Sequence, residues 1–398
     1  MSAVPPIADL RLPARLAMRR RRWIAGPVLI VAALLGLVIW SQLAGGGNLT
    51  VFVVFGRMYA SAIHPPAGAL LNTATGYDGQ FFYVQALDPL LLHDATVHAL
   101  SAAEAGFRMQ RMAYPALAYL LAGGQASAVP FALLAVNVFV LLGLTIAFAI
   151  YFARRGWSAF WALPLALMPG MLLPVLRDLS DPLATAALVA GIVWWQNGSR
   201  WPAALALTVA VLTREVMIVA VVGVAAEAAV RDWRAWRLSC GVRLMAGRVW
   251  PVIALPAAAF VAWQAYVVIR NGGLPGDANL GLPFANLIQE ANWSLAGRPP
   301  LYAAWDIAYL LLILAAIGVA FLSAWRQLTV TSAAAAAIAI GVLVPAFGDI
   351  WSDTRLSAAL FALLLIDGLQ RRARPALIIS AAAASMTALL PLGLANLS

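Results

Sequence analysis

A single carboxylate in the segment GYDGQFFY, residues 76–83, is the strongest candidate for chemistry in this chain. Asp78 stands between two glycines, which allow backbone or substrate to approach closely, and aromatic residues that can pack on a sugar or a lipid follow it. A carboxylate in such a setting can act as a general base for a hydroxyl group. The same residues also predict a helix over QFFYVQAL with Asp78 as its N-cap. The two roles are compatible, and the sequence leaves both open.

Two further charged segments are candidates for function. In PVLRDLSDP, Arg177, Asp178 and Asp181 fall within about one helical turn, so Arg177 can pair with Asp181. In LTREVMIV, Arg214 and Glu215 lie between two short apolar runs, and the planar guanidinium of Arg214 suits the oxygens of a phosphate. The alternatives are a salt-bridged helix start in the first segment and an internal Arg214–Glu215 ion pair in the second.

A third charged segment, FGDIWSDTRLS, carries Asp349, Asp353 and Arg355. Like the other charged segments, it lies at the end of an expected span and is a candidate for function. The alternative is a solvated loop followed by a helix cap, which the Ser and Asp residues of the segment also favour.

Pairs of acids are candidate ligands for a divalent cation. Asp78 with Asp88, or Asp178 with Asp181, would supply the oxygen ligands that such an ion prefers, although spacing alone does not establish a site. The chain has a single cysteine, so a site of several thiolates is excluded. No segment has the spacing of a P-loop or of a dinucleotide-binding loop.

The composition is that of a membrane protein that crosses the bilayer many times. The 398 residues are 63% hydrophobic and 11% charged, with a mean hydropathy of +0.88. The net charge of +10 arises from 26 basic residues, all of them arginine, which is typical of a GC-rich bacterial genome. Arginines gather in the loops that stay in the cytoplasm, so the charge does not indicate a nucleic-acid partner.

We expect an all-α polytopic transmembrane bundle of about eleven spans, with its N-terminus inside. The apolar runs lie near 23–43, 129–152, 157–175, 183–196, 201–213, 216–230, 249–270, 301–325, 329–347, 355–369 and 376–394. The alternative of one long helix over 201–230 would bury two ionisable residues and place the arginine-rich loop that follows outside. The chosen threading puts twelve of the sixteen acids at the outer side, although acids contribute little to topology.

The expected organisation has four parts. Residues 1–22 form a basic cytoplasmic N-terminus, 23–43 the first transmembrane helix, 44–128 a long outer loop, and 129–398 the remaining bundle with short loops. Within the outer loop, RMAYPALAYLLAGG predicts a helix that lies in the membrane interface. If this helix were a span instead, every later loop would change sides.

These motifs together resemble the GT-C superfamily of membrane glycosyltransferases. Asp78 in GYDGQFFY stands where the family has an essential acid in its first outer loop, soon after the first span. RMAYPALAYLLAGG resembles the interfacial helix of the aminoarabinose and protein-mannosyl transferase branches, and LTRE resembles their basic helix tip. The combination of GYDGQFFY, ALDP, RMAYP, RDLSDP and LTRE is also similar to bacterial membrane proteins linked to cell-surface glycopolymers. The likeness covers about the first 230 residues.

The resemblance implies inverting transfer of a sugar from a polyprenyl-phosphate donor to a glycan, lipid or protein acceptor, at the outer face of the cytoplasmic membrane. Asp78 would be the general base, and no cofactor beyond a possible divalent cation is expected. The donor phosphate would bind Arg214, Arg177 and Arg355. The residues expected to bind substrate or support the site are Tyr77, Gln80, Tyr83, Asp88, Arg111, Asp178, Asp181 and Glu215.

The chain departs from the family in two respects. Protein-mannosyl transferases have a paired Asp-Glu in this loop, whereas Gly79 follows Asp78 here. The chain also lacks a sizeable soluble C-terminal domain, which leaves acceptor recognition to the loop 271–300 or to a partner. Two other functions fit the same features: a transporter or flippase for lipid-linked sugars, and a non-catalytic scaffold for glycopolymer assembly.

Overall fold

The structure is a computed structural model that describes residues 14–45, 47–71, 73–102, 106–238, 246–273, 281–344 and 350–389. Within these ranges the chain is almost entirely helical, and Gly56 and Thr73 form one isolated β-bridge. The expected all-α class is therefore confirmed for this part of the chain. The first thirteen residues of the expected basic N-terminus, and Asp349, lie outside the described ranges.

Apolar helices, most of them long, form a bundle, and short helices occupy the first loop. The bundle comprises α1 (Ala14–Ala44), α7 (Val129–Arg154), α8 (Ala162–Ala166), α9 (Pro169–Arg177), α10 (Asp181–Gln196), α11 (Arg200–Thr213), α12 (Ile218–Leu238), α13 (Ala246–Asn271), α14 (Ala285–Gly297), α15 (Pro300–Arg326), α16 (Val330–Leu343), α17 (Ile350–Arg371) and α18 (Arg374–Ser385). The first loop contains α2 (Thr50–Val53), α3 (Ala60–Ile63), α4 (Gly79–Leu87), α5 (Asp94–Ala102), η1 (Gly106–Gln110) and α6 (Ala113–Ala122). The remaining 3-10 segments are η2 (Ala126–Ala128), η3 (Ala159–Trp161), η4 (Glu215–Met217) and η6 (Met386–Leu389).

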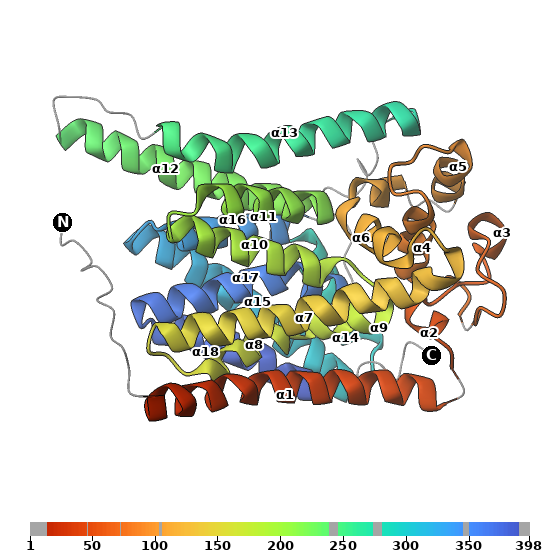
Figure 1. Cartoon of the computed structure of the whole chain (residues 1–398), viewed down its shortest axis with the longest axis horizontal. Coiled ribbons are helices and arrows are strands. Elements are labelled where there is room, and N and C mark those ends of the chain that lie inside the picture. Colours follow the sequence, from red (N-terminus) through yellow and green to blue (C-terminus); the bar gives the residue numbers. More distant parts are fainter. Residues whose placement is uncertain are drawn as a thin grey trace.

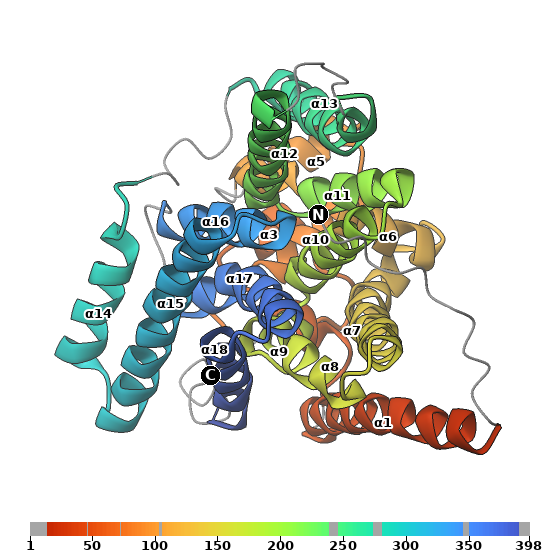
Figure 2. The same ribbon diagram turned by 90° about the vertical axis from the view of Figure 1, so that its left-hand side faces the viewer.

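The short helices α2–α6 gather at one end of the bundle (Figure 1). Near the middle of the bundle lies α17, which packs against α9, α10, α15, α16 and α18 (Figure 2). Every residue of α17 from Asp353 to Leu369 is buried. A helix that is apolar on nearly all sides needs neighbours on every face, which explains its central position.

Local sequence explains how α9 reaches α17. Proline in the first turn begins α9, as it does α7, α10, α15 and α18, because its missing N–H is unpaired in that turn anyway. A Cβ on Gly170 would lie 2.0 Å from the carbonyl oxygen of Thr354, so glycine allows α9 to pack tightly on α17. This contact brings Arg177, at the end of α9, towards Arg355 on α17.

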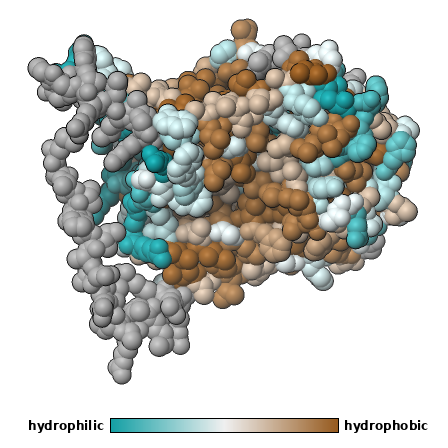
Figure 3. Space-filling view, turned by 45° about the horizontal axis from the view of Figure 1, so that its top comes forward, coloured by the Kyte–Doolittle hydropathy of each residue, from teal (hydrophilic) through white to brown (hydrophobic). Residues whose placement is uncertain are grey.

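The protein is a helical protein embedded in a membrane. Four described stretches are long and apolar enough to cross it: 23–44, 126–154, 249–271 and 300–326. The pair α8–α9, bent by 54°, would make a fifth span. Figure 3 shows a broad apolar region in the middle of the visible face, with polar residues towards both ends. The expected short spans at 201–213 and 216–230 are separate helices, α11 and α12, so one continuous helix over 201–230 is not observed. The total of eleven spans stays a prediction.

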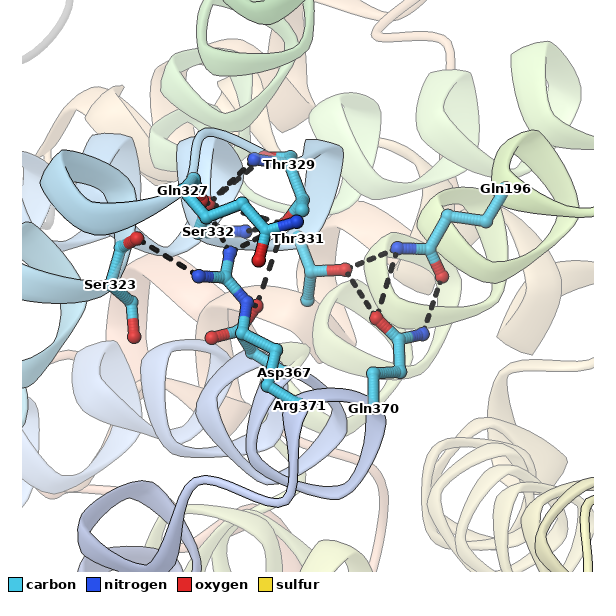
Figure 4. A network of polar contacts seen from close by, with 9 residues as sticks. All are labelled: Gln196, Ser323, Gln327, Thr329, Thr331, Ser332, Asp367, Gln370 and Arg371. Carbon is cyan, nitrogen blue, oxygen red and sulfur yellow. Dashed lines mark hydrogen bonds and ion pairs between the residues drawn. The ribbon is translucent and has the colours of Figure 1, made fainter. Parts of the chain in front are cut away.

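A polar network lies at the end of the bundle away from the short helices (Figure 4). Arg371, the last residue of α17, pairs with Asp367 at 2.8 Å and donates to the carbonyl of Ser323 at 3.0 Å. Gln370 donates to Gln196, the last residue of α10, at 2.8 Å. The ends of α10, α15 and α17 therefore lie together, and the predicted threading places all three on the cytoplasmic side. Which end faces the cytoplasm stays a prediction.

Candidate functional site

Asp78 lies where the short helices of the first loop meet the bundle. Its Oδ1 accepts a hydrogen bond from Nη2 of Arg108 in η1, and its Oδ2 accepts from Nη1 of Arg355 on α17 at 3.4 Å. Asp78 occupies the N-cap position of α4, but its backbone is helical and its side chain makes no capping hydrogen bond. The expected capping role is therefore wrong, because the two arginines bind the carboxylate instead.

Gly79 determines how α4 meets the bundle. A Cβ at this position would lie 2.4 Å from the carbonyl oxygen of Arg177 and 2.8 Å from that of Val53. Such distances are too short for any other residue, so the glycine lets the start of α4 rest on backbone from α2 and α9. The expected close approach of backbone at this glycine is therefore observed, whereas an approach of substrate stays a prediction.

Arg108 is the site residue that sequence reasoning missed. Its guanidinium packs over the rings of Phe81 and Phe107, 4.5 Å and 4.2 Å from their centroids, while it donates to Asp78. Two aromatic contacts and an ion pair hold the group in one orientation. The only local signal was the spacing of Arg108 and Arg111 in FRMQRM, which puts two arginines about one helical turn apart.

The acids Glu215 and Asp181 pair with arginines other than those that are near them in the sequence. Arg111 donates to Glu215 through Nε at 2.9 Å and Nη2 at 2.7 Å, a bidentate pair. Arg214 pairs with Asp181, the first residue of α10. The expected Arg214–Glu215 and Arg177–Asp181 ion pairs are therefore not formed. The α11–α12 turn is instead tied to η1 on one side and to α10 on the other.

Arg177 and Arg355 flank the ring of Tyr77. Their guanidinium carbons lie 6.0 Å and 5.6 Å from its centroid, within the range of cation–π attraction. Arg355 is also held by its own helix, with Nη2 donating to the hydroxyl of Ser352 at 2.8 Å and Nε to the carbonyl of Trp351 at 3.3 Å. Tyr77 thus contacts two arginines, of which Arg355 also contacts Asp78.

We call this group of side chains the arginine cluster. It consists of Tyr77, Asp78, Arg108, Arg111, Arg177, Asp181, Arg214, Glu215 and Arg355. Five arginines against three carboxylates leave it with a net charge of +2. Burial by itself would raise the pKa of Asp78, but the charges of Arg108 and Arg355 outweigh it and hold the pKa well below its usual range. The Asp78 carboxylate is therefore ionised at neutral pH.

Four expected site residues lie outside the cluster. Gln80 is buried and braces the loop, accepting from the N–H of Gly56 at 3.0 Å. Tyr83 is buried against Phe55. Asp88 accepts from the N–H groups of Leu92 and His93 at 2.9 Å and 2.8 Å. Asp178 ends α9 with a positive φ of 48° and lies near Tyr114 of α6.

Three of the four acids in the expected cation-binding pairs are engaged by other groups. The oxygens of Asp78 face two arginines, those of Asp88 face backbone N–H groups, and Asp181 is paired with Arg214. In the part of the chain that the structure describes, no group of three or more histidine, cysteine or acidic side chains could ligate a metal ion. The cluster offers cationic donors for an anion instead.

The arginine cluster has the features of a site for a phosphate group. Its guanidinium groups are buried or nearly so and are oriented by aromatic rings, carboxylates and backbone oxygens before any ligand arrives. Oriented guanidinium groups bind phosphate oxygens in pairs, with little further ordering. No family model, curated protein or solved structure matches this chain.

Proposed function

We propose that the protein is a membrane glycosyltransferase. It transfers a sugar from a polyprenyl-phosphate donor to a glycan, lipid or protein acceptor of the cell envelope, at the outer face of the cytoplasmic membrane. The supporting observation is that one carboxylate of the first loop is held by arginines from two separate elements, η1 and α17. A carboxylate and a phosphate present similar oxygen pairs to a guanidinium, so Asp78 occupies the position that suits the donor phosphate.

The charge of the cluster suits the leaving group of this reaction. A phosphate monoester carries close to two negative charges at neutral pH, and the cluster has a net charge of +2 before Asp78 moves. Arginines that are already oriented stabilise the charge that develops on the leaving phosphate without further reorganisation. Arg108, Arg355 and Arg177 fit this role, whereas Arg214, which is 4% exposed and paired with Asp181, supports the helix turn.

In the proposed reaction the donor phosphate displaces Asp78 from Arg108 and Arg355. The released carboxylate loses the two charges that depress its pKa and becomes a stronger base. Asp78 removes the proton from the acceptor hydroxyl while that oxygen bonds to the anomeric carbon of the sugar. The bond between this carbon and the phosphate oxygen breaks, and polyprenyl phosphate leaves with the electron pair. A direct displacement of this kind inverts the anomeric centre.

The neighbouring helix α6 suits a donor with a lipid tail. Its leucines at 117, 120 and 121 are exposed, at 39%, 72% and 54%, while Tyr114 is fully buried. Such a helix, apolar on its outer face and packed on α7 and α4, is suited to a membrane interface. An interfacial position is the one expected for RMAYPALAYLLAGG, and Arg111 of the arginine cluster directly precedes this helix region in the chain.

The test is to delete the gene in its host and to re-express variants at matched membrane levels. Wild type should restore a missing surface glycan, and Asp78→Asn should not, while its lipid-linked donor accumulates. Asp94→Asn is the matched control, because Asp94 belongs to the same loop but its side chain is 79% exposed and pairs with Arg270 outside the cluster. Full restoration by Asp78→Asn would refute the proposed general base.

The rival transporter function has less support. Transporters place polar binding groups at helix breaks near the bilayer midplane. The break between α8 and α9 falls at Leu167 and Met168, which carry no charge, and the charged break at Arg214 belongs to the arginine cluster near the end of the bundle. A polar midplane site of the transporter kind is therefore not indicated at either break.

A further inference from the structure

A second polar site lies at the opposite end of the bundle from the arginine cluster. A cavity of about 780 Å³ opens between the ends of α10, α11, α12, α13 and α16. Gln196 and Thr329, which line it, belong to the polar network in Figure 4. The other end of α10 carries Asp181, fifteen residues earlier, so the two sites are about 22 Å apart along this helix. The cavity is thus not part of the proposed transferase site.

A buried acid, Glu227, lines the cavity, and one of its oxygens has no hydrogen-bond partner among the described residues. Glu227 on α12 is 7% exposed, and its Oε1 lies 3.6 Å from Nη1 of Arg231, one turn further on. Its Oε2 is buried and has no hydrogen-bond partner among the described residues. A buried acceptor without a partner costs free energy, so the Glu227 carboxylate is suited to a donor supplied by a ligand in the cavity. An ammonium group supplies such donors together with the opposite charge.

Two arginines also line the cavity. Arg231 pairs only loosely with Glu227 and has a side chain that is 41% exposed, and Arg200 is exposed at the start of α11. Both can turn their guanidinium groups towards an anion at the cavity opening. The cavity therefore offers a carboxylate in its interior and two cations nearer the surface, which is the charge pattern complementary to an ammonium joined to a phosphate.

The surroundings of the cavity favour a lipid over a soluble ligand. Trp201 and Trp250 adjoin its lining residues Arg200 and Val249 in the chain. They are 49% and 56% exposed, and their rings meet edge to face with 6.4 Å between centroids. Exposed tryptophans of this kind gather at the level of lipid headgroups. The cavity wall itself is partly apolar, through Trp195 and two valines. A molecule with a charged head and an apolar tail fits both surfaces.

We propose that this cavity binds the headgroup of a zwitterionic phospholipid with a primary ammonium, of the phosphatidylethanolamine type. The ammonium donates to the carboxylate of Glu227, and the phosphate accepts from Arg231 and Arg200. The acyl chains leave the cavity past Trp201 along the bundle surface. By the predicted threading the lipid belongs to the cytoplasmic leaflet, and it braces α11, α12 and α16 at the ends where they meet the polar network.

Lipids of graded chemistry test the proposal on the unaltered protein. Thermal unfolding of the purified full chain in detergent is followed with added phosphatidylethanolamine, its N-methyl and N,N-dimethyl forms, phosphatidylcholine or phosphatidylglycerol. The stabilising shift should fall stepwise as N–H donors are lost, and phosphatidylglycerol should give less than phosphatidylethanolamine. Equal shifts for all five lipids would overturn the proposal. Equal stabilisation by soluble phosphoethanolamine would overturn the lipid assignment in favour of a small zwitterion.

Variants test which residues recognise the two charges. Glu227→Gln should abolish the preference for phosphatidylethanolamine over phosphatidylcholine, whereas Arg231→Gln should weaken binding of both lipids about tenfold, the effect of one hydrogen bond to a charged group. Arg234→Gln is the matched control, because Arg234 is exposed on the same helix and does not line the cavity. If Glu227→Gln keeps the wild-type preference among the lipids, the carboxylate does not bind the ammonium and the assignment is wrong.

Discussion

Replacing Asp78 by asparagine should strengthen the binding of polyprenyl phosphate while abolishing sugar transfer. In the unliganded protein Asp78 is 16% exposed, accepts from Arg108 and lies 3.4 Å from Arg355. One hydrogen bond to a charged group contributes about 1.5–3 kcal/mol, and since the second contact is long we take about 2 kcal/mol for both. A phosphate must displace these contacts in the wild type but meets only a neutral amide in the variant. Because 1.4 kcal/mol corresponds to a tenfold change, affinity should rise about thirtyfold.

Calorimetric titration of the purified protein with a short-chain polyprenyl phosphate measures this effect. The same variant should lose transfer activity, and its unliganded form should be less stable by about 2 kcal/mol, because two buried arginines lose their shared carboxylate. Asp94→Asn should leave affinity, transfer and stability unchanged. If Asp78→Asn binds polyprenyl phosphate more weakly than wild type, the carboxylate does not compete with phosphate for the arginines, and the displacement mechanism is refuted.

Three further predictions concern the packing of Gly79, the pH dependence of stability and the orientation of the protein in the membrane. Gly79→Ala should lower the folded membrane level strongly, because its Cβ would lie 2.4 Å from a backbone oxygen, whereas Gly143→Ala, with open space around it, should not. The pKa of Asp78 is depressed in the folded protein, so its ion pairs stabilise the fold at any pH above its ordinary pKa of 3.8. The free energy of unfolding should therefore stay level between about pH 5 and 8 and fall below about pH 4. This fall should be less steep in Asp78→Asn than in wild type. In a background with the native cysteine replaced, an impermeant thiol reagent on intact cells should label Met58→Cys but not Trp325→Cys; the reverse pattern would invert the orientation.

Composition and hydrophobic runs determined the class of the protein. A chain in which 63% of the residues are hydrophobic has too few polar residues to shield its apolar surface from water. Runs of about twenty apolar residues match the thickness of the bilayer as helices, because a helix satisfies its own backbone hydrogen bonds. The break at Arg214 was also readable, since a helix with two ionisable residues at its centre is costly in a membrane. These properties depend on neighbouring residues in the chain, which is why sequence alone was sufficient for them.

The sequence also pointed to Asp78, but not to what it does in the folded chain. A carboxylate before a helix predicts a cap, and only the approach of η1 and α17 replaces that cap with two arginines. The ion pairs that the sequence suggested for Arg177 and, as an alternative, for Arg214 are not formed, for a related reason. Proximity in sequence favoured Asp181 and Glu215, whereas packing of the helix ends pairs Arg214 with Asp181 and Arg111 with Glu215.

Tertiary structure decided the pairing because the partners are far apart along the chain. Asp78 and Arg355 are separated by 277 residues, and Arg111 and Glu215 by 104. No periodicity or local preference carries information over such distances, so Arg108 had no distinguishing sign beyond its spacing from Arg111. Whether a buried charge is tolerated depends on which opposite charge the packed helices bring within a few ångströms, and that is a property of the assembled bundle.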